Sequence, residues 1–264
     1  MKMDTAQRLL ALNRQFYTPC AGAFARTRGV NQAGLLPSLP FLPPTPIVLD
    51  LGCGQARLAG WLANQRPSLT YIGLDASAGL LHAAARTVAS LATVRAQLLL
   101  ADVTAPDWPA AVLPLLPTGV RFDAIYALAR LHLLPGFDLR ATVLRQAARL
   151  LAPAGVLVVS YGQFLDEARG RQRQLPWETI GLTAGEMDPG DALLDWRRAG
   201  HGLRYVHHVT PAEAAHLAAA ADLQVAATYH ADGQSTHPNF LQSLAPECIR
   251  GQPESPHAPP RLNT

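Results

Sequence analysis

Short runs of apolar residues recur through the middle of the chain, and most are followed by a stretch with helical spacing or composition. The runs cover 47–50, 69–75, 96–103, 122–128 and 156–161, and each predicts a buried strand. Strands that are apolar without alternation are typical of parallel sheets covered on both faces. The pattern therefore predicts a doubly wound α/β fold, a mostly parallel sheet with helices on both faces.

The N-terminal part of the chain has a different pattern. Residues 4–17 predict an amphipathic helix that runs toward Pro19, and residues 31–46 are rich in proline and glycine, as a linker would be. We therefore expect residues 1–45 to form a helical lid and linker, followed by one sheet domain over residues 46–245.

The C-terminal part also departs from strand–helix alternation. Residues 163–202 combine arginine and tryptophan with many glycines and prolines, which predicts an insert that lies over the sheet edge as a lid or substrate loop. A helix over 211–220, capped by Thr210, and a last strand over 223–229 are expected after it. Residues 246–264 are dominated by proline, serine and glycine and predict a disordered tail.

Composition excludes several classes of protein. The 264 residues are 49% hydrophobic and 16% charged, so the chain is globular and long enough to bury a full core. A net charge of +3 neither indicates nor excludes a nucleic-acid partner, and Lys2 is the only lysine. Cysteines and histidines lack metal-ligand spacing, so no metal is expected. With no membrane-length apolar run or signal peptide, we expect a cytoplasmic location; a protein partner stays open.

The glycine turn after the first strand is the strongest candidate for a ligand site. Gly52 and Gly54 separate that strand from a helix, as in nucleotide-binding α/β proteins. A dinucleotide fingerprint needs a third glycine where this chain has Arg57. Asp50, beside the turn, would repel a pyrophosphate but suits a ligand with an ammonium and a sulfonium. The turn therefore favours S-adenosylmethionine (SAM) over NAD or ATP.

Acidic residues end the first three strands. They are Asp50, Asp75 and Asp102, and Asp75 follows the glycines at the distance typical of a ribose-binding acid. The carboxyl ends of neighbouring parallel strands share one sheet edge, where ligands of open α/β sheets bind. We therefore expect the three carboxylates to surround one cofactor.

These motifs resemble those of class I SAM-dependent methyltransferases. The matching segments are 49–54, 73–75, 101–103 and 122–125. The resemblance implies a seven-stranded Rossmann-like sheet, with SAM as cofactor and S-adenosylhomocysteine as product. Asp50 and the turn would hold the methionine end, Asp75 the ribose, and Asp102 with the Val103 backbone the adenine. The implied cofactor-binding residues are Asp50, Gly52, Cys53, Gly54, Asp75, Ala76, Asp102, Val103 and Ala127.

A narrower resemblance extends outside the sheet. Residues 17–28 fit the pattern Y-x3-A-x2-F-x2-T-R, residues 129–132 fit A-x-x-H, and residues 204–207 fit R-Y-x-H. These segments are similar to those of the tRNA methyltransferases that esterify 5-carboxymethyl-uridine at the wobble position. Leu133 and Phe240 depart from that family, which has histidine and tryptophan there. The resemblance implies substrate contacts from Tyr17, Arg28, Arg204, Tyr205 and His207.

The chemistry leaves the acceptor open. A hydroxyl or amine acceptor needs a base, for which His132 is the candidate, whereas a carboxylate is already ionised at neutral pH. Three functions are therefore considered. The first is methylation of tRNA, the second is methylation of a small metabolite, and the third is a non-catalytic SAM-binding subunit. The intact set of strand-end acids argues against the third.

Overall fold

The computed structural model describes residues 1–26, 33–66, 68–166, 168–196, 202–231 and 239–246. Arg28 and the predicted tail beyond 246 lie outside these ranges. None of the helices within them is both long enough and apolar enough to cross a lipid bilayer.

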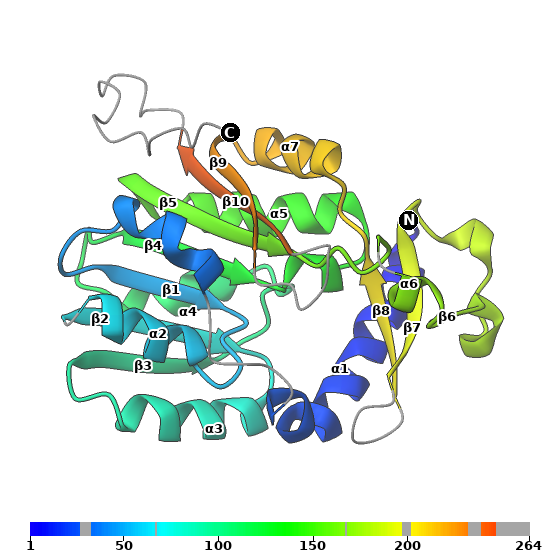
Figure 1. Cartoon of the computed structure of the whole chain (residues 1–264), viewed down its shortest axis with the longest axis horizontal. Coiled ribbons are helices and arrows are strands. Elements are labelled where there is room, and N and C mark those ends of the chain that lie inside the picture. Colours follow the sequence, from blue (N-terminus) through cyan, green and yellow to red (C-terminus); the bar gives the residue numbers. More distant parts are fainter. Residues whose placement is uncertain (27–32, 67, 167, 197–201, 232–238, 247–264) are drawn as a thin grey trace, which may run out of the picture.

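The main sheet has seven strands in the order β3-β2-β1-β4-β5-β10-β9 (Figure 1). β1 pairs in parallel with β2 and β4, and the parallel pairing extends to β3 and β5. β10 is antiparallel to both β5 and β9. The prediction of a doubly wound, mostly parallel seven-stranded sheet is confirmed. The strands are β1 Ile47–Leu51, β2 Leu69–Asp75, β3 Val94–Leu100, β4 Phe122–Leu128, β5 Leu151–Tyr161, β9 Leu223–Ala231 and β10 Asn239–Pro246.

Helices cover both faces of this sheet because successive strand residues point to opposite sides. On one face Leu49 packs with Trp108 of α4, Val143 of α5 and Leu217 of α7. On the other face Val48 packs with residues of α2, α3 and η1. These helices are η1 Ala33–Phe41, α2 Arg57–Gln65, α3 Ala78–Ala89, α4 Trp108–Val112, α5 Phe137–Ala148 and α7 Pro211–Ala220.

A second, smaller layer stands beside the carboxyl ends of the parallel strands (Figure 1). β6, β7 and β8 form a three-stranded antiparallel sheet, and helix α1 packs against β8. Leu9 of α1 is buried with Tyr205, and Phe16 of α1 with Trp196. The elements are α1 Met3–Arg26, β6 Gln174–Leu175, β7 Asp191–Trp196 and β8 Gly202–His207, with short turns η2 Leu113–Leu115, η3 Leu131–Leu133, α6 Ala168–Arg171, η4 Trp177–Ile180 and η5 Ala184–Glu186.

Several expected boundaries are confirmed. β2 and β4 span the predicted residues, and α7 spans 211–220 with the Thr210 hydroxyl accepting from the Glu213 N–H at 3.2 Å. Other boundaries were wrong. Helix α1 continues past Pro19 to Arg26, residues 33–41 of the expected linker form the 3-10 helix η1, and β5 begins at Leu151, five residues before 156.

Two predictions about topology were also wrong. The strand at 223–229 is not the last, because β10 follows it and inserts between β5 and β9. The segment 163–202 is not wholly a loop, because Gln174–Leu175 and Asp191–Trp196 pair into the small sheet. Both errors concern pairing between segments that are distant in sequence, which local periodicity does not encode.

Candidate functional site: a cavity under helix α1

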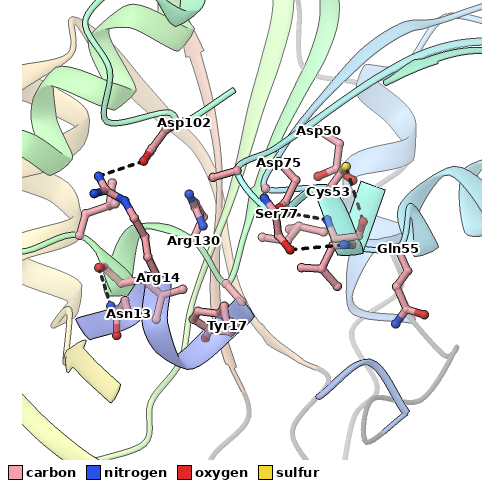
Figure 2. Close-up of a pocket in the computed structure, with 18 of the residues that line it drawn as sticks. Asn13, Arg14, Tyr17, Asp50, Cys53, Gln55, Asp75, Ser77, Asp102 and Arg130 are labelled. Carbon is pink, nitrogen blue, oxygen red and sulfur yellow. Dashed lines mark hydrogen bonds and ion pairs between the residues drawn. The ribbon is translucent and has the colours of Figure 1, made fainter. Parts of the chain in front are cut away.

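A cavity of about 310 Å³ lies between α1 and the carboxyl ends of the parallel strands (Figure 2). Its lining comes from α1, from the glycine turn after β1, and from the segments that follow β2, β3 and β4. This is the place where an open α/β sheet binds its ligand. The polar side chains that line it are Asn13, Arg14, Tyr17, Asp50, Cys53, Gln55, Arg57, Asp75, Ser77, Asp102, Thr104 and Arg130.

The glycine turn forms one wall of the cavity. The N–H groups of Gly52 and Cys53 donate to the Leu74 carbonyl at 2.7 and 2.9 Å, which ties the turn to β2. Gly52 and Gly54 have φ values of +78° and +58°, which favour glycine. A Cβ on Gly54 would meet nothing within 4 Å, so the turn presents bare backbone to the cavity there. Such a surface suits close approach of a ligand.

Asp75 joins the glycine turn to the start of α3. Its Oδ2 accepts from the Gly54 N–H at 3.0 Å, and its Oδ1 accepts from the Ser77 N–H at 2.8 Å. The Ser77 hydroxyl accepts in turn from the Leu80 N–H at 3.3 Å and caps α3. The carboxylate keeps lone pairs beyond these two bonds, so it can also accept from a ligand hydroxyl.

Asp50 is buried at the end of β1. Its Oδ2 accepts from the Tyr71 hydroxyl at 2.7 Å. Burial raises the pKa of Asp50 to about 7, although the Tyr71 hydrogen bond acts in the opposite direction. A cationic ligand group would favour the charged form of this carboxyl. The neighbouring Cys53 thiol also has a pKa raised by burial, which keeps it neutral and unreactive.

Asp102 follows β3 and faces α1 across the cavity. Its Oδ1 accepts from the backbone N–H and the hydroxyl of Thr104, both at 2.9 Å, and its Oδ2 lies 3.2 Å from Arg14 Nη2. Burial alone would raise the pKa of Asp102, but the Thr104 hydrogen bonds and the charges of Arg130 and Arg14 lower it overall. Asp102 is therefore ionised at neutral pH.

Asn13 fixes the position of α1 over the cavity. Its Nδ2 donates to the Leu133 carbonyl at 3.1 Å, and its Oδ1 accepts from the Tyr205 N–H at 2.9 Å. Both bonds are buried, so a substitution would leave unpaired polar groups. One side chain thus ties α1 both to the segment after β4 and to the small sheet.

The structure brings most of the predicted cofactor residues together. Seven of them line the cavity: Asp50, Gly52, Cys53, Gly54, Asp75, Ala76 and Asp102. Tyr17, predicted for the substrate, lines it too. Val103 and Ala127 are each 1% exposed and are not among the lining residues. A contact from Val103 would therefore have to come from its backbone.

Other predicted residues are not brought to the cavity. His132 is buried outside the lining, where its Nδ1 accepts from the Gly162 N–H at 3.5 Å and its ring lies 5.9 Å from that of Phe164. Arg204 lies on β8 and is also absent from the lining. The roles given to these two residues as base and substrate ligand stay predictions without support from cavity geometry.

Tyr205 and His207 belong to a buried polar network instead. The Tyr205 hydroxyl donates to Asp191 Oδ1 at 2.7 Å, and the same oxygen lies 2.7 Å from His207 Nδ1. His207 Nε2 lies 2.8 Å from Glu213 Oε2, and Glu213 Oε1 lies 2.8 Å from Arg140. The network joins β7 and β8 to α7 and α5. It therefore holds the small sheet against the main domain rather than facing a substrate.

The tryptophans of the 163–202 segment were expected to suit nucleic-acid bases. Trp196 is only 5% exposed and packs edge-on against Phe16, with ring centroids 5.5 Å apart. Trp177 packs at the edge of the cluster around Leu9 and Tyr205. The buried Trp196 ring cannot stack on a base, and the Trp177 ring is already partly covered by this cluster, so the two tryptophans give no support for RNA binding.

Three arginines that line the cavity were not predicted as site residues. Arg14 and Arg57 lie on helices, and a solvated helix face is the ordinary position of an arginine. Arg130 lies inside the A-x-x-H segment, where only the histidine was considered. The position of Arg130 directly after β4 is the signal that could have found it, because ligands bind at strand ends.

The comparisons with known proteins agree with this geometry. Residues 49–157 match the family model described as a methyltransferase domain. A SAM-dependent methyltransferase from Methanosarcina mazei has a similar fold, with a TM-score of 0.62, 16% identity, and 80% of this chain and 97% of that chain covered. A SAM-bound amino pentose methyltransferase from Micromonospora echinaspora gives a TM-score of 0.54, 17% identity, and coverage of 85% and 94%.

Residues 49–157 thus match a methyltransferase domain, and the fold around them is that of a SAM-dependent methyltransferase of known structure. The prediction of SAM as cofactor is confirmed at the level of this domain class.

The curated relatives are more specific. Trans-aconitate 2-methyltransferase of Methylobacterium nodulans is 32% identical over 56% of this chain and 50% of its own length. The corresponding protein of Azoarcus sp. (strain BH72) is 30% identical over 61% of this chain and 55% of its own length. The chain thus spans about half the length of the curated relatives it matches. The narrower resemblance to tRNA methyltransferases has no counterpart among these relatives.

Proposed function

We propose that this protein transfers the methyl group of SAM to a carboxylate of a small organic acid. The cavity under α1 carries the proposal, because α1 lies over the strand ends and leaves a space of about 310 Å³. Such a space admits a small acceptor better than a folded RNA. The similarity to trans-aconitate 2-methyltransferases supports an acid as acceptor, since trans-aconitate is a tricarboxylate.

The residues that line the cavity fit the cofactor. Asp50 and the backbone of the glycine turn would hold the methionine end, Asp75 the ribose hydroxyls, and Asp102 with the Val103 backbone the adenine. The open space at Gly54 and the free lone pairs of Asp75 are the observations that support this assignment. Bound SAM supplies an activated methyl group, which the acceptor oxygen takes from the sulfonium while the carbon–sulfur electron pair stays on sulfur.

The chain itself mainly has to align the two ligands and exclude water. Alignment alone can lower the barrier by about 7–11 kcal/mol. A carboxylate acceptor is ionised at neutral pH and gives up no proton on methylation, so it needs no base. This agrees with the position of His132 outside the cavity lining. A hydroxyl or amine acceptor would need a proton acceptor that the cavity would have to provide.

Mass spectrometry of reactions with SAM and single acids tests the proposal. We expect trans-aconitate or a related di- or tricarboxylic acid to gain one methyl group, and mild alkali to release methanol from the product because it is an ester. An alkali-stable product would instead show transfer to a hydroxyl or amine. Binding of S-adenosylhomocysteine without transfer to any acid would favour a non-catalytic subunit.

The tRNA hypothesis makes a different prediction. Phosphate contacts release counterions, so affinity for tRNA would fall steeply with salt. We expect filter binding with bulk tRNA to retain none at low or moderate salt. Salt-sensitive retention together with a methylated nucleoside would overturn the small-acid proposal.

A further inference from the structure

Among the described residues that line the cavity, Arg130 makes no ion pair at contact distance, although its charge acts on Asp102. Three carboxylates and three guanidinium groups are among the described residues that line it: Asp50, Asp75 and Asp102, with Arg14, Arg57 and Arg130. Arg14 pairs with Asp102 at 3.2 Å. Arg57 is attracted to Asp50, which opposes the lowering of the Arg57 pKa by burial. The oxygens of Asp75 accept from backbone N–H groups.

The turn after β4 directs Arg130 into the cavity. Ala129 has φ of +51°, a left-handed conformation that is uncommon for residues other than glycine and that clusters at functional sites. The Ala129 N–H donates to the Ser160 hydroxyl at 2.8 Å, which holds this turn against β5. Figure 2 shows the Arg130 side chain between Arg14 on one side and Asp75 on the other.

The glycine turn makes room for this side chain. A Cβ on Gly52 would lie 3.0 Å from Arg130 Cδ and 3.4 Å from its Nε. The stem of Arg130 therefore lies directly over Gly52, and its charged head extends over the wall on which a cofactor would lie. The absence of a side chain at Gly52 thus allows the positive φ of the turn and leaves space for the Arg130 side chain.

The head of Arg130 has unused hydrogen-bonding capacity. Its Nε is buried and has no hydrogen-bond partner among the residues that the structure describes. Arg130 also contributes to the low pKa of Asp102 through its charge. A buried donor without an acceptor is unfavourable, and a planar guanidinium binds carboxylates through paired N–H groups. A ligand carboxylate bound to the Arg130 guanidinium would supply the missing acceptor in this paired geometry.

We propose that Arg130 is the carboxylate-binding residue of this cavity. The inference rests on the proposed function, because methyl transfer to an acid brings two carboxylate ligands to this place. One source is the amino-acid end of the cofactor, and the other is the acceptor. In either case Arg130 places a ligand against the glycine turn and contributes specificity that a lysine, without the planar fork, would not reproduce.

The test compares Arg130→Gln with a matched control in the full-length chain. Arg95→Gln makes the same change at an exposed position of the edge strand β3. Calorimetry gives the affinity for S-adenosylhomocysteine and for methylthioadenosine, which lacks the amino-acid end. Steady-state kinetics at saturating SAM gives KM for trans-aconitate, or for whichever acid the wild-type protein methylates.

Two results support the inference and identify the source. An increase in KM of about tenfold or more for the acid, with affinity for S-adenosylhomocysteine unchanged, assigns the acceptor. A loss of about tenfold or more in affinity for S-adenosylhomocysteine, with affinity for methylthioadenosine unchanged, assigns the cofactor. Arg130→Lys should recover less than half of either loss.

Other results overturn it. If Arg130→Gln matches Arg95→Gln in affinity and KM, Arg130 binds no carboxylate, while the proposed function stands. Equal loss of both nucleoside ligands shows a change in the shape of the site rather than a lost carboxylate contact. If the wild-type protein methylates no acid, the proposed function fails, and the ratio of the two nucleoside affinities still decides whether Arg130 binds the cofactor carboxylate.

Discussion

Arg14 Nη2 lies 3.2 Å from Asp102 Oδ2, so helix α1 is tied to the end of β3 across the mouth of the cavity. Asp102 is the residue proposed to read the adenine, and its other oxygen already accepts two bonds from Thr104. The arginine therefore occupies the side of the carboxylate that an adenine amino group would use. The adenine of the cofactor would then compete with Arg14 for Asp102.

The first prediction follows from this competition. Arg14→Ala should tighten binding of S-adenosylhomocysteine by up to about fivefold, because an exposed ion pair is worth about 0–1 kcal/mol. The Arg14 side chain is 59% exposed, so added salt should produce a similar gain in the wild-type protein. Calorimetry at two salt concentrations measures both effects. Weaker binding by Arg14→Ala would show that Arg14 holds the cofactor instead.

The second prediction concerns Asp75. Asp75→Ala should weaken binding of S-adenosylhomocysteine by about tenfold or more, about 1.4 kcal/mol. It should also destabilise the ligand-free protein by about 1–3 kcal/mol, because the N–H groups of Gly54 and Ser77 lose their acceptor. Urea unfolding without ligand separates the two effects. Asp75→Asn keeps one acceptor oxygen and should be less destabilised. If both variants bind S-adenosylhomocysteine as tightly as the wild-type protein does, Asp75 does not belong to the site.

The third prediction uses the raised pKa of Asp50. The folded protein keeps this carboxyl protonated up to about pH 7, whereas the unfolded chain loses the proton near 3.8. The native state therefore binds more protons in this range, so the stability contributed by protonated Asp50 is present below about pH 4 and is lost as pH rises to about 7. Urea unfolding between pH 4 and 8 should show a smaller decline for Asp50→Asn than for the wild-type protein.

Binding of S-adenosylhomocysteine should also depend on the protonation of Asp50. A ligand ammonium near Asp50 favours the carboxylate, so S-adenosylhomocysteine should release a fraction of a proton at pH 7 and bind more tightly as pH rises through 7. Calorimetry in buffers of different ionisation enthalpy measures that release. Asp50→Asn should abolish the Asp50 part of it, and an unchanged release would place the ammonium elsewhere.

The fourth prediction concerns His207. Burial acts to lower the pKa of His207, but its hydrogen bonds to Asp191 and Glu213 outweigh burial and raise it. Both ring nitrogens lie within 2.8 Å of carboxylate oxygens, so the doubly protonated ring donates to both. This stability is fully present below the ordinary value near 6.5 and is lost as pH rises through the raised folded pKa.

His207→Gln should therefore destabilise the protein by about 1.5–3 kcal/mol at pH 6 and by less at high pH. Tyr205 reaches this group through Asp191 and Arg140 reaches it through Glu213, and the neighbouring His208 has a pKa that burial lowers. His216→Gln, at an exposed position of α7, is the matched control. A destabilisation that does not change with pH would show that the ring is neutral.

Local patterns in the sequence determined the parts of this protein that depend on neighbours in the chain. The strand over 69–75 ends in Asp75, and the turn at Gly52 and Gly54 follows β1, because apolar runs, positive φ and strand-end polarity are local properties. Parallel strands align their carboxyl ends, so the meeting of Asp50, Asp75 and Asp102 around one cavity could be inferred without coordinates.

The tertiary structure alone decided which distant residues meet. Nothing in the residues around Asn13 and Arg14 shows that one bonds to Leu133 and Tyr205 and the other to Asp102. The same holds for β10, whose place between β5 and β9 depends on pairing across the sheet. His207 lies in the R-Y-x-H segment, which predicted a substrate contact, whereas in the folded chain its ring lies between Asp191 and Glu213. Periodicity specifies which face of an element is buried, whereas the partner on that face depends on how the elements pack.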